Sequence, residues 1–140
     1  SVVAQKYPLA ELGKPVTLFK SHRPDCEDGE QQRDFIYVRD CSDVMLWLFE
    51  NPKVNGLFNC GSGEARSFVG LAGAVYAALD MEPSIEYIDT PEEIREKYQY
   101  FTEAKMDRLR AVGYDKPMTS LEEGVRKYVR GFLDSGDPYR

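Results

Sequence analysis

Histidine and cysteine are scarce in this sequence, and their scarcity excludes several kinds of site. The only histidine is His22, so a histidine-based metal cluster or a serine or cysteine triad would depend on it alone. The three cysteines, Cys26, Cys41 and Cys60, match neither a disulfide framework nor a CxxC pair. We therefore expect reduced, structural thiols, no metal site and no catalytic residue of these types.

Long apolar runs and an excess of positive charge are also missing. No window approaches the run of about 18 apolar residues that a membrane span needs, and no basic start precedes an apolar segment as in a secretory signal. The 18 basic and 24 acidic side chains give a net charge of −6, which disfavours a nucleic-acid partner. The sequence therefore predicts a cytoplasmic protein that binds neither membrane nor nucleic acid.

Alternating strand and helix patterns predict an α/β fold. Apolar residues make up 42% of the 140 residues, enough for the core of one domain. Runs of β-branched and aromatic residues predict strands at 16–19, 35–38, 57–60 and 85–88, with a polar loop at 20–32. Helices are predicted at 40–50, from 67, between 102 and 113 and from 120, before a frayed tail at 135–140. With about four strands, the sheet is expected to be small or incomplete.

Individual residues set the expected limits of the helices. Pro8 is expected to divide the opening segment into two short helices, the second of which Gly13 closes. Asp40 is predicted to cap a helix that is apolar nearly all round and therefore buried on more than one side. Ser67 and Ser120 are predicted to cap two later helices, and Ser120 begins a capping box.

Two local patterns could bind phosphate. The turn Gly61-Ser62-Gly63 could hold a pyrophosphate on backbone amides, but Arg66 stands where a dinucleotide fingerprint needs glycine or alanine. We interpret the turn as a plain connection, with cofactor binding as the alternative. Arg33 follows a loop with further basic side chains, so it is either part of an anion site or one half of a surface salt bridge.

Two clusters of similar side chains allow more than one interpretation. The sequence Tyr-Gln-Tyr-Phe at 98–101 is either a plug in the core or a surface on which a flat base stacks. The acidic run at 25–30 superficially resembles a calcium loop, but glycine and glutamate are missing at the required positions. A solvated loop is therefore the favoured interpretation of that run.

Several motifs together resemble a known family. They are Arg-Asp-Phe-Ile-Tyr-Val-Arg-Asp at 33–40, Gly-Leu-Phe-Asn-Cys-Gly-Ser-Gly at 56–63, Gly-Tyr-Asp-Lys-Pro at 113–117 and Ser-Leu-Glu-Glu-Gly at 120–124. Their order and spacing are similar to the C-terminal part of extended short-chain dehydrogenase/reductases that act on nucleotide sugars. The stretch at 85–104, which includes Tyr98, resembles the heptose 6-epimerases of that family.

The resemblance implies a substrate site, a cofactor and a reaction. Phe19, Lys20, Ser21 and His22 match the segment that lines the substrate site, Arg33 matches the arginine that holds the diphosphate, and Tyr98 matches the tyrosine that closes over the nucleotide. The implied reaction inverts C6 of an ADP-heptose by hydride transfer to and from NADP, for lipopolysaccharide synthesis. Relatives form homo-oligomers, including rings of five, so a homo-oligomer is expected here.

The resemblance further implies that residues 1–140 are a C-terminal portion: the substrate-binding domain with the last strand and helices of a Rossmann-like cofactor domain. No tyrosine is followed four residues later by lysine, so the Tyr-x-x-x-Lys pair of the family is absent from these residues. We expect this chain to be inactive alone, with NADP bound mainly by a part that precedes Ser1. The segment after Phe19, Gln5 and the long loop at 23–30 depart from the family pattern.

Two alternative functions remain open at this stage. One is a different NAD(P)-dependent nucleotide-sugar epimerase or dehydratase, and the other is a non-catalytic module that binds nucleotide sugars. The nucleotide part of the substrate separates the first alternative from the heptose enzyme. A glycine-rich strand–helix turn and a Tyr-x-x-x-Lys pair upstream of Ser1 would exclude the second.

Overall fold

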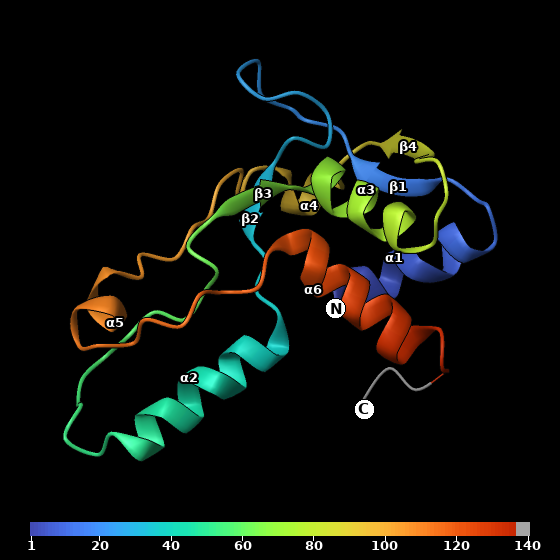
Figure 1. The fold of residues 1–140 in the computed structure, drawn as a ribbon. Coiled ribbons are helices and arrows are strands. Elements are labelled where there is room, and N and C mark those ends of the chain that lie inside the picture. Colours follow the sequence, from blue (N-terminus) through green and yellow to red (C-terminus); the bar gives the residue numbers. More distant parts are fainter. Residues whose placement is uncertain (137–140) are drawn as a thin grey trace.

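The structure is a computed structural model that describes residues 1–136, and its strands are interspersed with helices along the chain (Figure 1). The helices are α1 (Val2–Glu11), α2 (Val38–Glu50), α3 (Phe68–Ala78), α4 (Glu92–Arg95), α5 (Asp107–Ala111) and α6 (Leu121–Tyr128), which a π-helical segment, η1 (Val129–Leu133), continues. The strands are β1 (Val16–Phe19), β2 (Gln32–Asp34), β3 (Ala65–Ser67) and β4 (Ile85–Ile88). The α/β prediction is confirmed.

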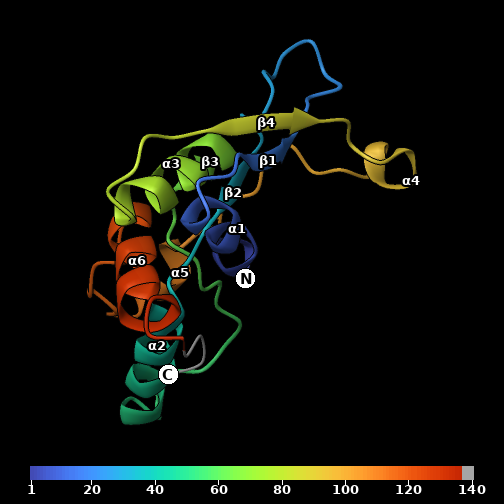
Figure 2. The same ribbon diagram turned by 90° about the vertical axis from the view of Figure 1, so that its right-hand side faces the viewer.

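The four strands of residues 1–136 form two separate pairs. β1 and β4 are parallel, with Val16 opposite Ile85 and Phe19 opposite Ile88, and α3 lies between them in the sequence. Figure 2 shows these two strands side by side, with α4 beyond the end of β4. β2 and β3 are antiparallel, with Arg33 opposite Arg66. The small sheet that the sequence predicts is therefore present as two ribbons.

The main core lies where α3 packs against α1 and α6, and where α1 and α3 pack against β1. α3 is rich in alanine and glycine, so neighbouring elements can approach it closely, and Ala72 and Val75 are completely buried. The Tyr76 hydroxyl donates to the carbonyl of Lys14 at 2.9 Å and to that of Ser84 at 2.7 Å. These bonds fix α3 against the segments that enter β1 and β4. No helix within 1–136 has both the length and the apolar character needed to span a bilayer.

The opening helix differs from the prediction because Pro8 does not divide it. α1 runs without a break from Val2 to Glu11, with Pro8 inside and with Tyr7 and Ala10 buried on either side. A proline removes one backbone hydrogen bond from a helix, and the burial of its neighbours offsets that loss. The predicted closure is confirmed, because Gly13 has a φ of +66° and Lys14 donates to the Leu9 carbonyl at 2.9 Å.

The predicted positions of the strand and the helix start within residues 32–40 were wrong. The strand is Gln32–Asp34 rather than 35–38, and α2 begins at Val38, so Asp40 lies in its first turn and is not the N-cap. The Asp40 carboxylate is buried and accepts hydrogen bonds from the amide and the hydroxyl of Thr119, at 2.7 and 2.8 Å. Asp40 is therefore used for a tertiary contact between α2 and the segment before α6.

One face of α2 is exposed, although the helix was expected to be buried on more than one side. Met45 is 63% exposed, Leu46 59% and Phe49 84%, while Val44 packs in a second, smaller core with residues of the α5 region. The strand predicted at 57–60 does not form, and Leu57 is 80% exposed. A strand needs a neighbour for its backbone groups, and none of the described segments pairs with this one.

Of the last two predicted helices, α6 starts where predicted and α5 starts later than predicted. Gly113, at a φ of +106°, follows α5 as expected, but α5 begins at Asp107 because Thr102 is paired through its amide with the Gln32 carbonyl at 3.3 Å. Ser120 caps α6 by accepting from the Glu123 amide at 3.3 Å. Ser67 caps α3 in the same way. Of the predicted tail, residues 137–140 lie outside the described residues.

Candidate functional site

The structure brings together the end of β1, the centre of β2 and the loop before α5. These are the three segments that hold the site residues predicted from the sequence. The ring of Phe19 meets the ring of Tyr98 edge-on, with centroids 5.9 Å apart, and the Arg33 guanidinium carbon lies 5.3 Å from the centroid of Tyr98. Residues far apart in the sequence thus form one cluster.

Arg33 is held by aromatic rings and has no carboxylate partner among residues 1–136. Its guanidinium lies over the ring of Tyr98 at 5.3 Å and over that of Phe68 at 5.8 Å, and Nη1 donates to the Gln32 carbonyl at 2.7 Å. The salt bridge considered for Arg33 is therefore not formed in the described part of the chain. A guanidinium restrained in this way keeps further N–H donors that can bind an anion.

Three other basic side chains of these segments and of the strand opposite already pair with acidic neighbours. Lys20 pairs with Asp89 at 3.4 Å, and Arg23 pairs with Asp25. Arg66, on the strand opposite, pairs with Glu122. Arg33 is therefore the cation of this region best suited to a diphosphate.

Ser21 and His22 lie in the segment directly after β1, which is fixed by one hydrogen bond within its own loop and by one to a distant segment. The Ser21 amide donates to Oδ1 of Asp28 at 2.6 Å, and the Thr90 amide donates to Nε2 of His22 at 3.3 Å. The Nε2 atom of His22 thus acts as a hydrogen-bond acceptor. Within residues 1–136 no three metal-ligating side chains gather, so this histidine has no metal-binding partners there.

Tyr98 and Tyr100 are half-buried and lie outside both core clusters. Their rings meet edge-on at 5.8 Å, while Phe101 is mostly exposed. Burial raises the pKa of Tyr98, and the positive charge of Arg33 opposes this only in part, so the phenol is protonated at neutral pH. The arrangement favours a ligand-facing surface over a plug in the core.

The turn at residues 61–63 is occupied by a side chain of the protein itself. Asp34 accepts hydrogen bonds from the Ser62 amide at 2.6 Å, the Ser62 hydroxyl at 2.7 Å, the Gly63 amide at 3.0 Å and the Ala104 amide at 2.9 Å. A Cβ on Gly61 would lie 2.6 Å from Oδ2 of Asp34, so glycine is needed for this approach. These residues do not fit a dinucleotide, because the amides that would hold its pyrophosphate already bind a carboxylate.

The pKa of Asp34 reflects that environment. Burial alone would raise it, but the hydrogen bonds from Ser62, Ala104 and Gly63 together outweigh burial and hold the pKa below the ordinary range of an aspartate. Asp34 is thus ionised at neutral pH and fixes two segments, the turn at 61–63 and the segment at Ala104, to β2. Sequence reasoning missed this role, although a carboxylate directly beside Arg33 was visible.

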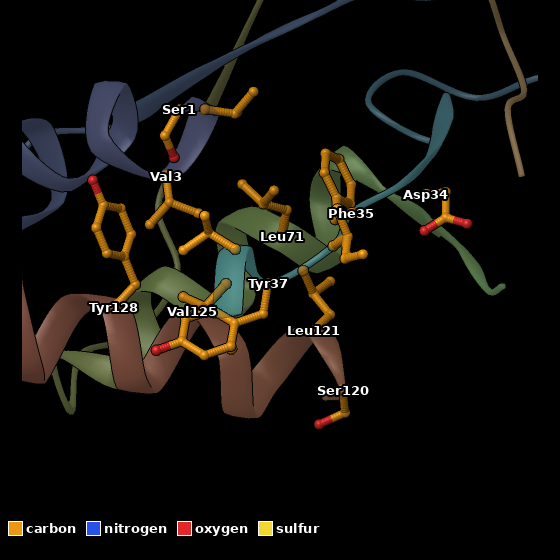
Figure 3. A pocket seen from close by; sticks show the side chains of 14 residues that line it. Ser1, Val3, Asp34, Phe35, Tyr37, Leu71, Ser120, Leu121, Val125 and Tyr128 are labelled. Carbon is orange, nitrogen blue, oxygen red and sulfur yellow. The ribbon is translucent and has the colours of Figure 1, made fainter. Parts of the chain in front are cut away.

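A separate groove of about 630 Å³ lies between the start of α1, the segment after β2 and α6 (Figure 3). Its lining is mainly apolar and includes Val3, Phe35, Tyr37, Leu121 and Val125. No lysine or arginine lines it, so a diphosphate would find no cation there. The groove is therefore distinct in character from the cluster around Arg33.

The cysteines of the described chain are free, as predicted. Burial, followed by the neighbouring Cys41, raises the pKa of Cys60 to about 11. A thiol with that pKa is protonated at neutral pH and is a poor nucleophile. Cys60 therefore has no role in the site.

Comparison with known proteins gives a consistent class. Residues 2–61 match the NAD dependent epimerase/dehydratase family. Among solved structures, the ADP-L-glycero-D-manno-heptose-6-epimerase of Helicobacter pylori matches 94% of this chain and 37% of its own, at 26% identity and a TM-score of 0.70. The UDP-glucose 4-epimerase of Thermus thermophilus, solved with NAD, matches 89% and 37%, at 26% identity and a TM-score of 0.71. The chain is thus homologous to nucleotide-sugar enzymes of the NAD dependent epimerase/dehydratase family.

Curated relatives narrow the resemblance within that family. The chain is 52% identical, over 99% of its length, to the ADP-L-glycero-D-manno-heptose-6-epimerase of Nitratidesulfovibrio vulgaris (strain DP4), and it covers 43% of that protein. It is 45% identical, again over 99% of its length, to the enzyme of the same name from Fusobacterium nucleatum, and it covers 44% of that protein. The resemblance to heptose 6-epimerases is therefore confirmed, and the chain spans less than half the length of these relatives.

Proposed function

We propose that this chain is the nucleotide-sugar-binding portion of an ADP-glycero-manno-heptose 6-epimerase, an isomerase that inverts C6 for lipopolysaccharide heptose synthesis. The observation that carries the proposal is Arg33, a guanidinium held between Tyr98 and Phe68 without a carboxylate partner in the described chain. A diphosphate is the anion that suits such a fork. The similarity to heptose 6-epimerases supports ADP-heptose as its source.

The predicted site residues take distinct roles in this proposal. Arg33 binds the diphosphate, and Tyr98, whose ring contacts both Arg33 and Phe19, closes over the nucleotide part. The turn formed by Lys20, Ser21 and His22 lines the sugar side. The hydrogen bonds of Ser21 to Asp28 and of His22 to Thr90 support this role, because a fixed segment orients a substrate at less entropic cost than a mobile one.

The proposal for the domains is that residues 1–140 are the substrate-binding part with the last strand and helices of a Rossmann-like cofactor domain. The exposed apolar face of α2 and the unpaired segment 57–60 support it, since both are suited to packing against a larger sheet. NADP, bound mainly by residues outside this chain, would supply hydride transfer, while this chain positions the substrate. A cytoplasmic homo-oligomer is part of the same proposal.

Substrate choice of the complete protein tests this function. We expect C6 inversion of ADP-heptose and little turnover of UDP- or dTDP-sugars, measured by NMR of the product. We also expect no activity from the 140-residue chain, with or without NADP, because it has no Tyr-x-x-x-Lys pair. A preference for a UDP- or dTDP-sugar would instead identify another epimerase or dehydratase, and binding without turnover by the complete protein would identify a binding module.

The apolar face of α2 gives a prediction for the isolated chain. We expect strong binding of the dye ANS, or self-association in the ultracentrifuge, because Leu46 and Phe49 expose adjacent apolar area. The double substitution Leu46→Glu and Phe49→Glu should remove most of the dye binding. Leu12→Glu is the control, since Leu12 is 68% exposed beyond the end of α1. A compact monomer that binds no dye would contradict the proposed domain arrangement.

A further inference from the structure

We propose that Tyr100 is a positioning residue that joins the three segments of the substrate site. The effect of Tyr100 on substrate binding rests on the proposed function, whereas its contacts are observed independently of that function. Through its hydroxyl, its ring and its backbone, Tyr100 contacts the turn after β1, the neighbouring Tyr98 and the strand that bears Arg33.

The hydroxyl of Tyr100 holds the turn after β1. It accepts a hydrogen bond from the His22 amide at 2.9 Å, across 78 positions of sequence. The His22 side chain is fixed from the other direction, because the Thr90 amide donates to its Nε2. The backbone and the side chain of His22 are thus bound by two different segments, and only the first of these bonds depends on Tyr100.

The ring of Tyr100 restrains two further side chains. The Arg23 guanidinium carbon lies 4.9 Å from the ring centroid, and the Arg23–Asp25 ion pair limits the movement of that guanidinium. The ring also packs edge-on against Tyr98 at 5.8 Å. A cation over one ring and an edge contact to the next are both favourable, so the ring links the long loop at 23–30 to Tyr98.

The backbone of Tyr100 adds a short ladder beside β2. Its carbonyl accepts from the Gln32 amide at 2.8 Å, and the Thr102 amide donates back to the Gln32 carbonyl at 3.3 Å. Gln32 directly precedes Arg33, so these two hydrogen bonds fix the position of Tyr100 relative to Arg33, the proposed diphosphate contact. Because its backbone is anchored at β2 and its hydroxyl at His22, Tyr100 fixes the separation of the diphosphate and sugar sides of the site.

Amide hydrogen exchange of His22 tests the contact itself. In the 140-residue chain, Tyr100→Phe should keep the ring contacts and lose the hydroxyl, so exchange of the His22 amide should accelerate about tenfold, the factor expected for loss of one net hydrogen bond. Tyr87→Phe is the matched control, because it removes the hydroxyl of a tyrosine on β4, opposite Leu18, and it should leave His22 exchange unchanged. An unchanged exchange rate of the His22 amide in Tyr100→Phe would overturn the proposal.

Steady-state kinetics of the complete, cofactor-loaded protein test the consequence. Tyr100→Phe should raise the KM for ADP-heptose about fivefold and change kcat by less than about twofold, because a misplaced turn weakens ground-state and transition-state binding equally. Tyr100→Leu, which also loses the ring, should raise the KM further. If the His22 amide exchanges faster but the KM is unchanged, Tyr100 is structural only and the proposal fails. If the wild-type protein does not turn over ADP-heptose, the proposed function fails while the exchange result still stands.

Discussion

Replacing Arg33 with alanine is expected to weaken ADP-heptose binding to the complete protein by about 2 to 3 kcal/mol, roughly 30- to 150-fold. The size follows from the chemistry of the contact, since a charge-assisted bond to a diphosphate is lost and the anion is left facing aromatic rings. Binding of NADP should not change, because the residues that bind the cofactor are proposed to lie outside this chain. The guanidinium of Arg33 already lies over the rings of Tyr98 and Phe68 before a ligand binds, so the site is preorganised.

Arg33→Lys should recover only part of this affinity, because an ammonium cannot reproduce the planar fork. The measurement is calorimetric titration of substrate into cofactor-loaded variants of verified fold. Arg126→Ala is a suitable control, since Arg126 is an exposed arginine of α6 that pairs with Glu123. Unchanged affinity in Arg33→Ala would reject the diphosphate role.

Tyr98→Phe, titrated in the same series, separates two modes of contact. A mild loss would mean that the ring alone stacks on the ligand, and a severe loss would mean that the hydroxyl donates to a phosphate oxygen. We favour the hydroxyl, because the ring already contacts Phe19, Tyr100 and Arg33 while the phenol is protonated at neutral pH.

Asp34→Asn is expected to destabilise the folded chain by about 3 kcal/mol at neutral pH. The carboxylate accepts hydrogen bonds from the Ser62 amide, the Ser62 hydroxyl, the Gly63 amide and the Ala104 amide. An asparagine offers one oxygen, and its NH₂ group would face donors that it cannot satisfy. The free energy of unfolding from urea titration is the measurement, and Asp115→Asn, an exposed site, should change it little.

The pH dependence of this effect has a definite sign. The pKa of Asp34 is lower in the folded than in the unfolded chain, so on acidification the unfolded state takes up the proton first. The stabilisation by Asp34 is therefore complete well above about pH 4, the ordinary aspartate range, and is lost as the pH falls through the folded-state pKa. The gap in stability between wild type and Asp34→Asn should narrow in acid. A gap that stays constant down to about pH 2 would contradict the role given to the carboxylate.

Short-range patterns were the ones that the sequence predicted well. The strands at 16–19 and 85–88 and the serine caps of α3 and α6 all occur where predicted. Each depends on side chains within a few residues of one another. The strand at 57–60 and the two-sided burial of α2 were wrong for this chain, because each depends on a partner that none of the described segments provides.

By itself, the sequence determined the α/β class, the ends of most helices and the resemblance to nucleotide-sugar epimerases, since local geometry and motif order carry that information. Only the tertiary structure decided that the Arg33 side chain lies over aromatic rings and forms no ion pair within residues 1–136, and that Asp34 fills the glycine turn. The physical reason is distance along the chain. Asp34 bonds to residues 28 and 70 positions away, and such partners become neighbours only when packing brings their segments together.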